Sequence, residues 1–288
     1  MAILETQNLS YIYSENTPFQ VTAIEDINIS IEEGEFIGII GHTGSGKSTL
    51  VQQLNGILKP SSGKILYDGQ DIHSSKEFTR SVRFNVGLCF QYPEYQLFEN
   101  TVYDDIAFGP KNMGLSKDEI EQNVLEAAGF VGVKTDMLKK SPFDLSGGEK
   151  RRVAIAGVMA MKPKVLILDE PTAGLDPKGR KTVEGMIENY RQATKSTVII
   201  VSHSMEDVAR CASRVIVMNK GRVEMFDKVS KVFANIERLV EIGLDAPSIT
   251  KIFLELKNRG YDVRTDIYTL EKAKEELLRL LKERGVAV

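Results

Sequence analysis

The sequence is short of several features that define whole classes of protein. It contains no tryptophan and only two cysteines, Cys89 and Cys211, among 288 residues. Two cysteines in apolar surroundings do not make a disulfide framework, so we expect free thiols in a reducing compartment. Apolar runs such as 165–168 and 198–201 are far shorter than the roughly 18 residues that cross a bilayer. The N-terminal segment MAILETQNLS also lacks the basic and apolar regions of a secretory signal.

Neither sign of charge dominates. The chain has 37 Lys plus Arg against 40 Asp plus Glu, which gives a net charge of −3. That balance provides no broad electrostatic attraction to nucleic acid, so no nucleic-acid partner is expected. Hydrophobic residues make up 42% and charged residues 27%, as in an ordinary globular protein. The length predicts roughly two domains, or one domain with an appendix.

Strands and helices alternate along the central part of the chain. The runs 36–40, 86–90, 165–168 and 198–201 are continuously apolar. Such runs are typical of strands that are buried on both faces of a parallel sheet. Helical patterns lie between them at 48–58, 117–128, 147–161 and 179–194. The pattern predicts an α/β fold.

The two ends of the chain have a different texture. Segments 3–13 and 22–31 alternate in polarity, which predicts an antiparallel β-subdomain packed on the α/β core. After about residue 229, three amphipathic helices are predicted at 232–242, 248–259 and 270–284. We therefore expect a main domain over 1–229 and a helical extension over 230–288, which is too small to hold a large core alone.

Residues 41–48, GHTGSGKS, fit the phosphate-loop pattern G-x-x-x-x-G-K-[ST] between a predicted strand and a predicted helix. Its glycines let backbone N–H groups turn toward a polyphosphate, and the helix N-terminus adds partial positive charge. A chance glycine-rich turn would not require this strand–loop–helix context. The predicted phosphate-binding residues are Gly41, Thr43, Gly44, Ser45, Gly46, Lys47, Ser48 and Thr49.

Polar side chains follow the other predicted parallel strands. Asp169 and Glu170 follow 165–168, Gln91 follows 86–90, and His203 follows 198–201. Ligands of open α/β sheets bind at the carboxyl ends of the strands, so we expect these groups to converge on the phosphate loop. Asp169 can hold Mg²⁺ and Glu170 can orient or deprotonate a water molecule, although two acids after a strand can also be a solvated turn.

A second glycine-rich helix start lies at 145–149, LSGGE. Ser146 and Glu149 have the spacing of a capping box, which by itself indicates only a good helix start. The capping box does not explain Gly147 and Gly148, since glycine weakens a first turn unless something must approach the backbone. A second phosphate contact is therefore predicted. The basic residues at 150–152 are expected to form a solvated helix face or to support the site locally, rather than to bind nucleic acid.

Taken together, the motifs resemble those of the ATP-binding cassette (ABC) ATPases over residues 3–225. The match comprises the phosphate loop as Walker A, Gln91 as the Q-loop glutamine, LSGGE as the signature, 165–170 as Walker B, 173–176 as the D-loop and His203 as the switch histidine. The resemblance implies a P-loop ABC core with an antiparallel β-subdomain and a helical subdomain at about 92–160. It also implies an ATPase that uses ATP and Mg²⁺.

The resemblance also assigns roles to single residues. Lys47, Glu170 and His203 are implied to be catalytic, and Ser48, Gln91 and Asp169 to bind Mg²⁺. Two cassettes of that family close head to tail over two ATP molecules. The residues implied to complete the partner's site are Ser146, Gly147, Gly148, Glu149 and Asp176. Tyr13 resembles the aromatic residue that stacks on adenine, with Tyr11 as its rival and a half-buried strand tyrosine as the simpler alternative.

Residues 90–98, FQYPEYQLF, and 105–110, DIAFGP, resemble the ATPases of energy-coupling factor (ECF) importers of vitamins or of cobalt and nickel ions. The insertion at 14–19 is more like the second of that group's two paralogous ATPases. The resemblance implies a second ATPase subunit, a transmembrane scaffold (T-type) protein and a substrate-capture (S-type) membrane protein as partners. It also implies peripheral attachment to the cytoplasmic face of the membrane, with the C-terminal extension supporting the dimer.

Two rival functions remain open at this point. A conventional ABC importer fed by a soluble binding protein shares every catalytic motif. A soluble ABC protein of translation or DNA repair is disfavoured, because such proteins usually carry two cassettes or a long coiled-coil insertion. The segment 91–109 holds five aromatic residues, about half of which we expect in the core and half at an interface: Tyr92, Tyr95, Phe98, Tyr103 and Phe108.

Overall fold

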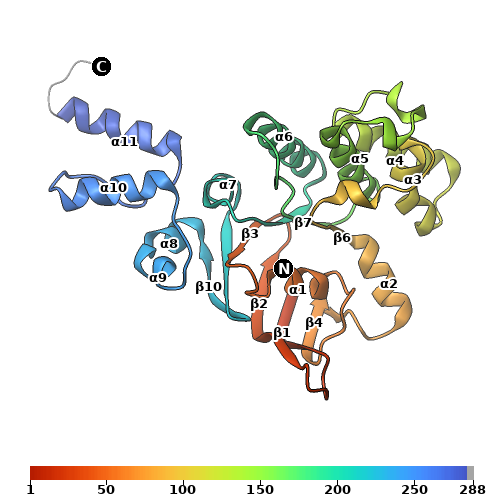
Figure 1. Cartoon of the computed structure of the whole chain (residues 1–288), viewed down its shortest axis with the longest axis horizontal. Helices are drawn as coiled ribbons and strands as arrows, with labels where there is room; N and C mark the ends of the chain where they lie inside the picture. The colour runs from red at the N-terminus through yellow and green to blue at the C-terminus, as the bar shows by residue number, and fades with distance from the viewer. Residues whose placement is uncertain (284–288) are drawn as a thin grey trace.

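The computed structural model describes residues 1–283, which are built around two β-sheets (Figure 1). The larger sheet has six strands in the order β10-β9-β3-β8-β7-β6. Four of these strands were predicted from continuous apolar runs. They are parallel and fully buried: β3 (Phe36–Gly41), β6 (Val86–Cys89), β7 (Val165–Asp169) and β8 (Thr197–Val201). The α/β fold class is therefore confirmed.

The sheet is completed by two strands that the sequence analysis did not identify. β9 (Arg214–Asn219) runs parallel to β3, and β10 (Arg222–Lys228) pairs antiparallel with β9 at the edge. Burial differs between them, since the interior of β9 is buried whereas β10 is half-buried. The parallel strands end at a common edge of the sheet, which positions the candidate site described below.

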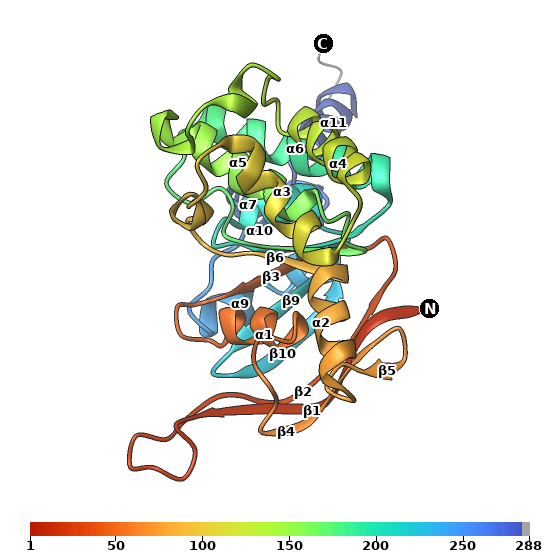
Figure 2. The same cartoon turned by 90° about the vertical axis from the view of Figure 1, so that its right-hand side faces the viewer.

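The smaller sheet is the predicted antiparallel subdomain. Its four strands lie in the order β2-β1-β4-β5 and span Ala2–Tyr13 (β1), Val21–Glu32 (β2), Ser62–Tyr67 (β4) and Gln70–Asp71 (β5). Figure 2 shows helix α1 (Lys47–Leu54) between this sheet and the larger one. The predicted helix at 48–58 thus ends four residues early, at Leu54.

The buried strands contribute to two cores because successive side chains point to opposite faces. Ile167 packs in the core shared with α1 and the antiparallel sheet, whereas Leu166 and Leu168 pack in the core under the helices of the other face. The helices of that other face are α3 (Val102–Met113), α4 (Lys117–Phe130), α5 (Gly147–Met159) and α6 (Pro177–Thr194). The patterns at 117–128, 147–161 and 179–194 correspond to α4, α5 and α6.

Three helices of the described chain were not predicted from the sequence. They are α2 (Lys76–Asn85), whose only buried residue is Val82, α3, which contains Pro110, and the short α7 (Met205–Cys211). Figure 1 shows α3–α5 at the opposite end of the long axis from the C-terminal helices. Over residues 1–283, no helix combines the length and apolarity needed to cross a membrane, and Cys89 and Cys211 are both free, as predicted.

The C-terminal part is helical, as expected, but not with the predicted bounds. The single helix predicted at 232–242 is wrong: α8 (Val229–Ala234) and α9 (Ile236–Glu241) meet at Asn235, whose backbone (φ −95°, ψ 55°) leaves the helical region. α10 (Ser248–Asn258) and α11 (Leu270–Glu283) follow, with a small core of Phe253, Val263, Ile267 and Ala273. The last residue predicted for the final helix, residue 284, lies outside the described residues, as do residues 285–288 of the extension.

Candidate functional site

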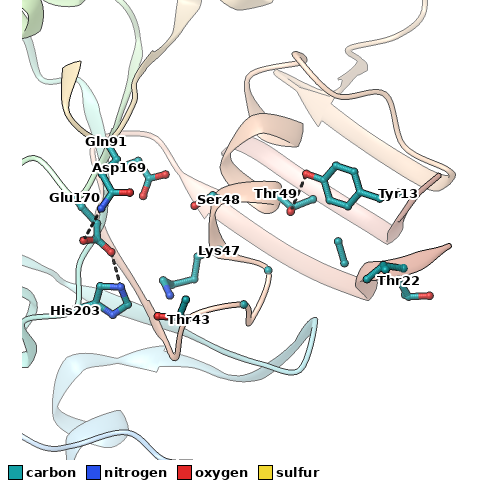
Figure 3. A pocket seen from close by; sticks show the side chains of 14 residues that line it. Tyr13, Thr22, Thr43, Lys47, Ser48, Thr49, Gln91, Asp169, Glu170 and His203 are labelled. Carbon is teal, nitrogen blue, oxygen red and sulfur yellow. Dashed lines mark hydrogen bonds and ion pairs between the residues drawn. The ribbon is translucent and has the colours of Figure 1, made fainter. Parts of the chain in front are cut away.

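A cavity of about 430 Å³ opens at the carboxyl ends of the parallel strands (Figure 3). It is lined by residues that the sequence analysis selected from five separate stretches of the chain, together with three residues of β2. The lining comprises Tyr13, Val21, Thr22, Ala23, Thr43, Gly44, Gly46, Lys47, Ser48, Thr49, Gln91, Asp169, Glu170 and His203. The expected convergence of these strand ends therefore exists.

The phosphate loop leads from β3 into α1. Gly46, the residue before α1, has φ +99°, and a Cβ atom there would lie 2.7 Å from the Ala23 carbonyl oxygen. Only glycine fits both constraints, so the loop closes tightly against β2. Lys47 Nζ donates to the carbonyl oxygens of Gly41 at 2.7 Å and His42 at 3.0 Å, which holds the ammonium group at the loop.

Charge at the site is concentrated and partly buried. Burial lowers the pKa of Lys47, and the nearby carboxylates of Glu170 and Asp169 oppose that shift. Burial raises the pKa of Asp169, which is 7% exposed, while a hydrogen bond from Ser48 and the Lys47 charge act in the opposite direction. Lys47 and Asp169 therefore partly neutralise each other in a region with little water.

Glu170 is the point at which the strand ends meet. One carboxylate oxygen, Oε1, lies 2.6 Å from His203 Nε2, and the other, Oε2, accepts a 3.4 Å hydrogen bond from Gln91 Nε2 (Figure 3). Burial raises the pKa of Glu170 above its ordinary 4.5, and His203 opposes the shift. The backbone is left-handed at this residue (φ +51°) and is held by a 3.0 Å bond from Glu170 N–H to the Val201 carbonyl.

Tyr13 lies at the other end of the cavity. Its hydroxyl is 3.3 Å from Thr49 Oγ1, and its ring meets Tyr11 edge-on with centroids 4.8 Å apart. Tyr11 does not line the cavity; it packs against the core beneath the antiparallel sheet. Of the two rival tyrosines, only Tyr13 can therefore contact a ligand in this cavity from its present position. About half of its surface is available for such a contact, since Tyr13 is 40% exposed.

The LSGGE helix start is separate from this cavity. Ser146 and Glu149 form the predicted capping box, with Ser146 Oγ 2.6 Å from Glu149 Oε2. Gly147 and Gly148 are exposed, and a Cβ atom at either would meet nothing within 4 Å. Packing within the described chain therefore does not require glycine at either position. Asp176 accepts a 2.8 Å bond from Gly179 N–H at the start of α6 and shares a smaller cavity with Gly148.

The sequence analysis missed one buried ion pair beside the cavity. Arg151, only 4% exposed, makes a two-pronged contact with Glu94, at 2.9 Å from Nε and 2.6 Å from Nη2. The expectation of a solvated helix face is thus wrong for Arg151, and local support is the alternative that the structure favours. A signal was present, because Arg151 lies four residues before the fully buried Ile155 on the same helix face.

The aromatic residues of 91–109 are more exposed than predicted. Four of the five are at least 42% exposed, namely Tyr92, Tyr95, Phe98 and Phe108, whereas Tyr103 packs against a core. The expected even division between core and surface is therefore wrong. Phe98 and Phe108 contact each other edge-on, with ring centroids 5.0 Å apart, so the exposed rings form a surface rather than isolated side chains.

The chain is similar to known proteins over nearly its full length. Residues 24–173 match the family model of the ABC transporter. The energy-coupling factor transporter ATP-binding protein EcfA2 of Caldanaerobacter subterraneus subsp. tengcongensis is 54% identical over 279 residues, covering 97% of this chain and 98% of the relative. The protein of the same name from Clostridium perfringens is 52% identical over 280 residues, with the same two coverages of 97% and 98%.

Solved structures agree with these relatives. The cbiO1 protein of Clostridium perfringens, described as part of the ABC transporter complex cbiONQ, superposes with a TM-score of 0.74 at 41% identity, covering 90% of this chain and 97% of its own. The bacterial ABC transporter cassette MJ0796, solved as a dimer, gives a TM-score of 0.70 at 27% identity, covering 78% of this chain and 98% of its own. A further structure of that cassette is a post-hydrolysis state with bound ADP and Pi.

Proposed function

Because this chain belongs to the ABC transporter family, as an ATP-hydrolysing subunit of the energy-coupling factor type, we propose that the cavity between Tyr13 and Glu170 is its ATP site. The observation that carries the assignment is the convergence of Gln91, His203 and Lys47 on Glu170 at one end of that cavity. The family relationship favours the ECF importer over a conventional importer fed by a soluble binding protein.

We propose that the residues nearest the phosphate loop also hold Mg²⁺. Ser48 and Asp169 supply the hydroxyl and carboxylate oxygens that this hard cation prefers, and Gln91 lines the same end of the cavity. Mg²⁺ is typically held by one or two carboxylates together with substrate phosphates, and this donor set fits that habit. When bound, the cation neutralises charge on the phosphates during transfer.

The proposed reaction divides between the two charged groups of the site. Lys47 and the loop N–H groups bind and orient the phosphates. Burial raises the pKa of Glu170 toward neutral pH, which makes the carboxylate a better base. Glu170 then accepts the proton of the attacking water. His203, 2.6 Å from Glu170, holds the carboxylate in place and senses the terminal phosphate.

We propose that a second ATPase subunit completes the site. The bare, exposed backbone at Gly147 and Gly148 suits the close approach of a phosphate held by another chain, and the N-terminus of α5 adds favourable partial charge. Ser146, Glu149 and Asp176 lie around the same surface and are assigned to the partner's site with them. The dimeric state of the similar cassette MJ0796 supports this arrangement.

Tyr13 provides a direct test of the nucleotide assignment. Tyr13→Ala should weaken ATP binding about tenfold, since stacking on a base contributes about 1–3 kcal/mol. Tyr13→Phe should bind within about twofold of the parent, because the ring remains and only the 3.3 Å contact to Thr49 is lost. Calorimetric titration with ATP measures both. Tyr11→Ala is the matched control, and a larger loss there than in Tyr13→Ala would make Tyr11 the stacking residue.

The membrane scaffold is proposed to dock on the helical subdomain. A groove of about 350 Å³ runs between α3 and α5 and is lined by the exposed rings of Phe98 and Phe108 and by Asp105. Asp105 Oδ1 accepts from Phe98 and Glu99 N–H, while Oδ2 is buried without a partner among the described residues. An apolar groove that contains an unpaired buried carboxylate oxygen suits a T-type segment carrying apolar side chains and one strong donor.

The groove predicts an unusual stability effect. Burial raises the pKa of Asp105 above its ordinary 3.8, so the folded chain binds the proton more tightly than the unfolded chain. The stability contributed by Asp105 therefore falls as the pH rises from 3.8 through the higher pKa of the folded chain. Asp105→Asn should accordingly raise the free energy of unfolding at pH 7 by about 1 kcal/mol. The gain should disappear below pH 3.8. Urea unfolding of the isolated chain at both pH values measures the difference.

Asp104→Asn is the matched control, because the pKa of Asp104 is shifted in the opposite direction from that of Asp105. Hydrogen bonds from Lys111 and Thr101 hold the pKa of Asp104 below its usual range, so its contribution is present at pH 7 and is lost in acid. Asp104→Asn should therefore lower stability at pH 7. A loss of stability in Asp105→Asn at pH 7 would contradict the unpaired buried charge on which the docking groove rests.

The C-terminal extension is proposed to support the dimer. α10 and α11 share their own small core, yet Leu270, Leu277 and Leu281 of α11 remain exposed. An apolar helix face of this kind is a common feature of subunit interfaces. Attachment through partners at the cytoplasmic face of the membrane, as a peripheral subunit, is the localisation that accompanies these proposals.

Detergent extraction and affinity purification of the chain from its own cells test the assembly. We expect a second ATPase, a transmembrane scaffold and a small substrate-binding membrane protein to co-purify, and Mg²⁺-ATP to drive uptake after reconstitution. A complex whose uptake requires a soluble binding protein would contradict the ECF assignment. Salt-sensitive association with nucleic acid or ribosomes would contradict the transport function altogether.

A further inference from the structure

Arg151 is a buried guanidinium that joins three functional segments of the chain. It belongs to α5, one helical turn after Gly147. Besides its two bonds to Glu94, its Nη1 group donates to the carbonyl oxygens of Ala173 at 2.5 Å and Pro171 at 3.4 Å. Glu94 follows Gln91 by three residues, and Pro171 follows Glu170 directly. The side chain thus connects the signature helix, the Q-loop and the segment that leads from Walker B to the D-loop.

The pair has the features of a rigid link. Burial raises the pKa of Glu94, but the bonds and charge of Arg151, together with a backbone hydrogen bond, bring the pKa below its ordinary value and favour the charged form. The guanidinium Cζ also lies 5.8 Å from the centre of the Tyr92 ring. A planar fork that binds a carboxylate on one side and two carbonyls on the other fixes direction as well as distance. A lysine has only one donor group and cannot span both sides.

We propose that Arg151 is a positioning residue of the ATPase, which sets Gln91 and Glu170 of its own site according to the position of the signature helix. The inference rests on the proposed function, in which Gly147 and Gly148 contact the nucleotide of the partner subunit. That contact fixes the start of α5 and hence Arg151. Arg151 in turn holds Glu94 and the carbonyls of Pro171 and Ala173. The position of α5 therefore orients the segments of its own site that carry Gln91 and Glu170. The two ATP sites therefore communicate through one side chain.

The test uses the assembled complex and compares turnover with ATP binding. The variants are Glu94→Gln, Arg151→Lys and the two combined, with Glu224→Gln as a matched control. Glu224 pairs with Arg238 at 2.6 Å, away from the cavity. Glu94→Gln keeps an acceptor oxygen and leaves the guanidinium bound to its two carbonyls, so it tests the link even where changes at Arg151 impair folding. Turnover is expressed per ATP-binding site, which removes the effect of any unfolded protein.

We expect Glu94→Gln and Arg151→Lys each to lower turnover per site about tenfold, because small misplacements of catalytic groups are costly, while the ATP dissociation constant stays within about twofold. The double variant should lose no more than the worse single variant, since both changes break the same link. Glu224→Gln should match the parent. A purely structural role would lower the number of binding sites and leave turnover per site unchanged.

Turnover per site within twofold of the parent in both single variants would overturn the inference, as would losses that multiply in the double variant. Failure of the proposed function is recognised separately. If the parent complex hydrolyses no more Mg²⁺-ATP than Glu170→Gln, the ATPase assignment fails, whatever the Arg151 variants do. If the parent is active and the Glu94 and Arg151 variants match it, only the link is wrong.

Discussion

Glu170→Gln should reduce ATP turnover in the assembled complex by about a thousandfold while ATP binding persists. Glutamine preserves the size of the side chain and can still meet His203 and Gln91, but it cannot accept a proton from water. General-base catalysis typically contributes about 10²–10⁴ in rate, which sets the scale of the loss. Single-turnover hydrolysis and retention of labelled ATP measure the two effects independently.

The measurement must be made at each composite site separately, because a paired chain with its own glutamate can mask the loss. Glu188→Gln is a suitable control, since Glu188 is a partly exposed glutamate of α6 that pairs with Arg191. Unchanged hydrolysis at the site of the altered chain would rule out Glu170 as the base, and the 2.6 Å contact with His203 would then be structural.

Gly148→Val should abolish most turnover without weakening the fold. A Cβ atom at this position meets nothing within 4 Å, so the isolated variant should keep its melting temperature and its affinity for ATP. In the proposed head-to-tail dimer, the valine would occupy the space that the partner's phosphate must approach. Loss of backbone donors aimed at a transition state typically costs about 10²–10³ in rate. Turnover of the partner's site should fall by that factor.

Gly185→Val controls for the cost of a bulky residue in an exposed helix. Gly185 lies within α6, and a Cβ atom there also meets nothing within 4 Å. We expect the control to hydrolyse ATP at the parent rate. Equal activity of the Gly148 and Gly185 variants would remove the physical reason for assigning the signature to the partner's site, and with it the head-to-tail arrangement.

The sequence predicts the position of the candidate site better than the bounds of the helices and strands. The phosphate loop was located from its motif. Asp169, Glu170, Gln91 and His203 were expected to converge on it because strand ends in a parallel sheet share one edge, and all four line the cavity. Some helices were missed for local reasons. Helix α2 was missed although Phe78 and Val82 have helical spacing, because the helix spans only ten residues and repeats that spacing once.

The remaining errors depend on tertiary contacts. The local signal for the break of the helix predicted at 232–242 is weak, since Asn235 can end a helix but no glycine or proline marks the position. The ion pair of Arg151 with Glu94 joins residues 57 positions apart. A basic run at a helix start usually indicates a solvated face. The spacing of Arg151 from Ile155 places the arginine on the buried face, but its partner Glu94 is known only from the packing of α5 against the Q-loop segment.

At Glu170 the backbone conformation favours glycine, whereas the proposed reaction requires a carboxylate side chain. For a non-glycine residue a φ of +51° costs about 1 kcal/mol or more, which the surrounding sheet must offset. Glycine would relieve that strain but has no carboxylate. Selection for a stable chain alone would therefore drift away from glutamate here. Variants recovered for heat resistance should be sequenced at this codon first, because a substitution that gains stability at Glu170 would also remove the proposed base and with it ATP hydrolysis.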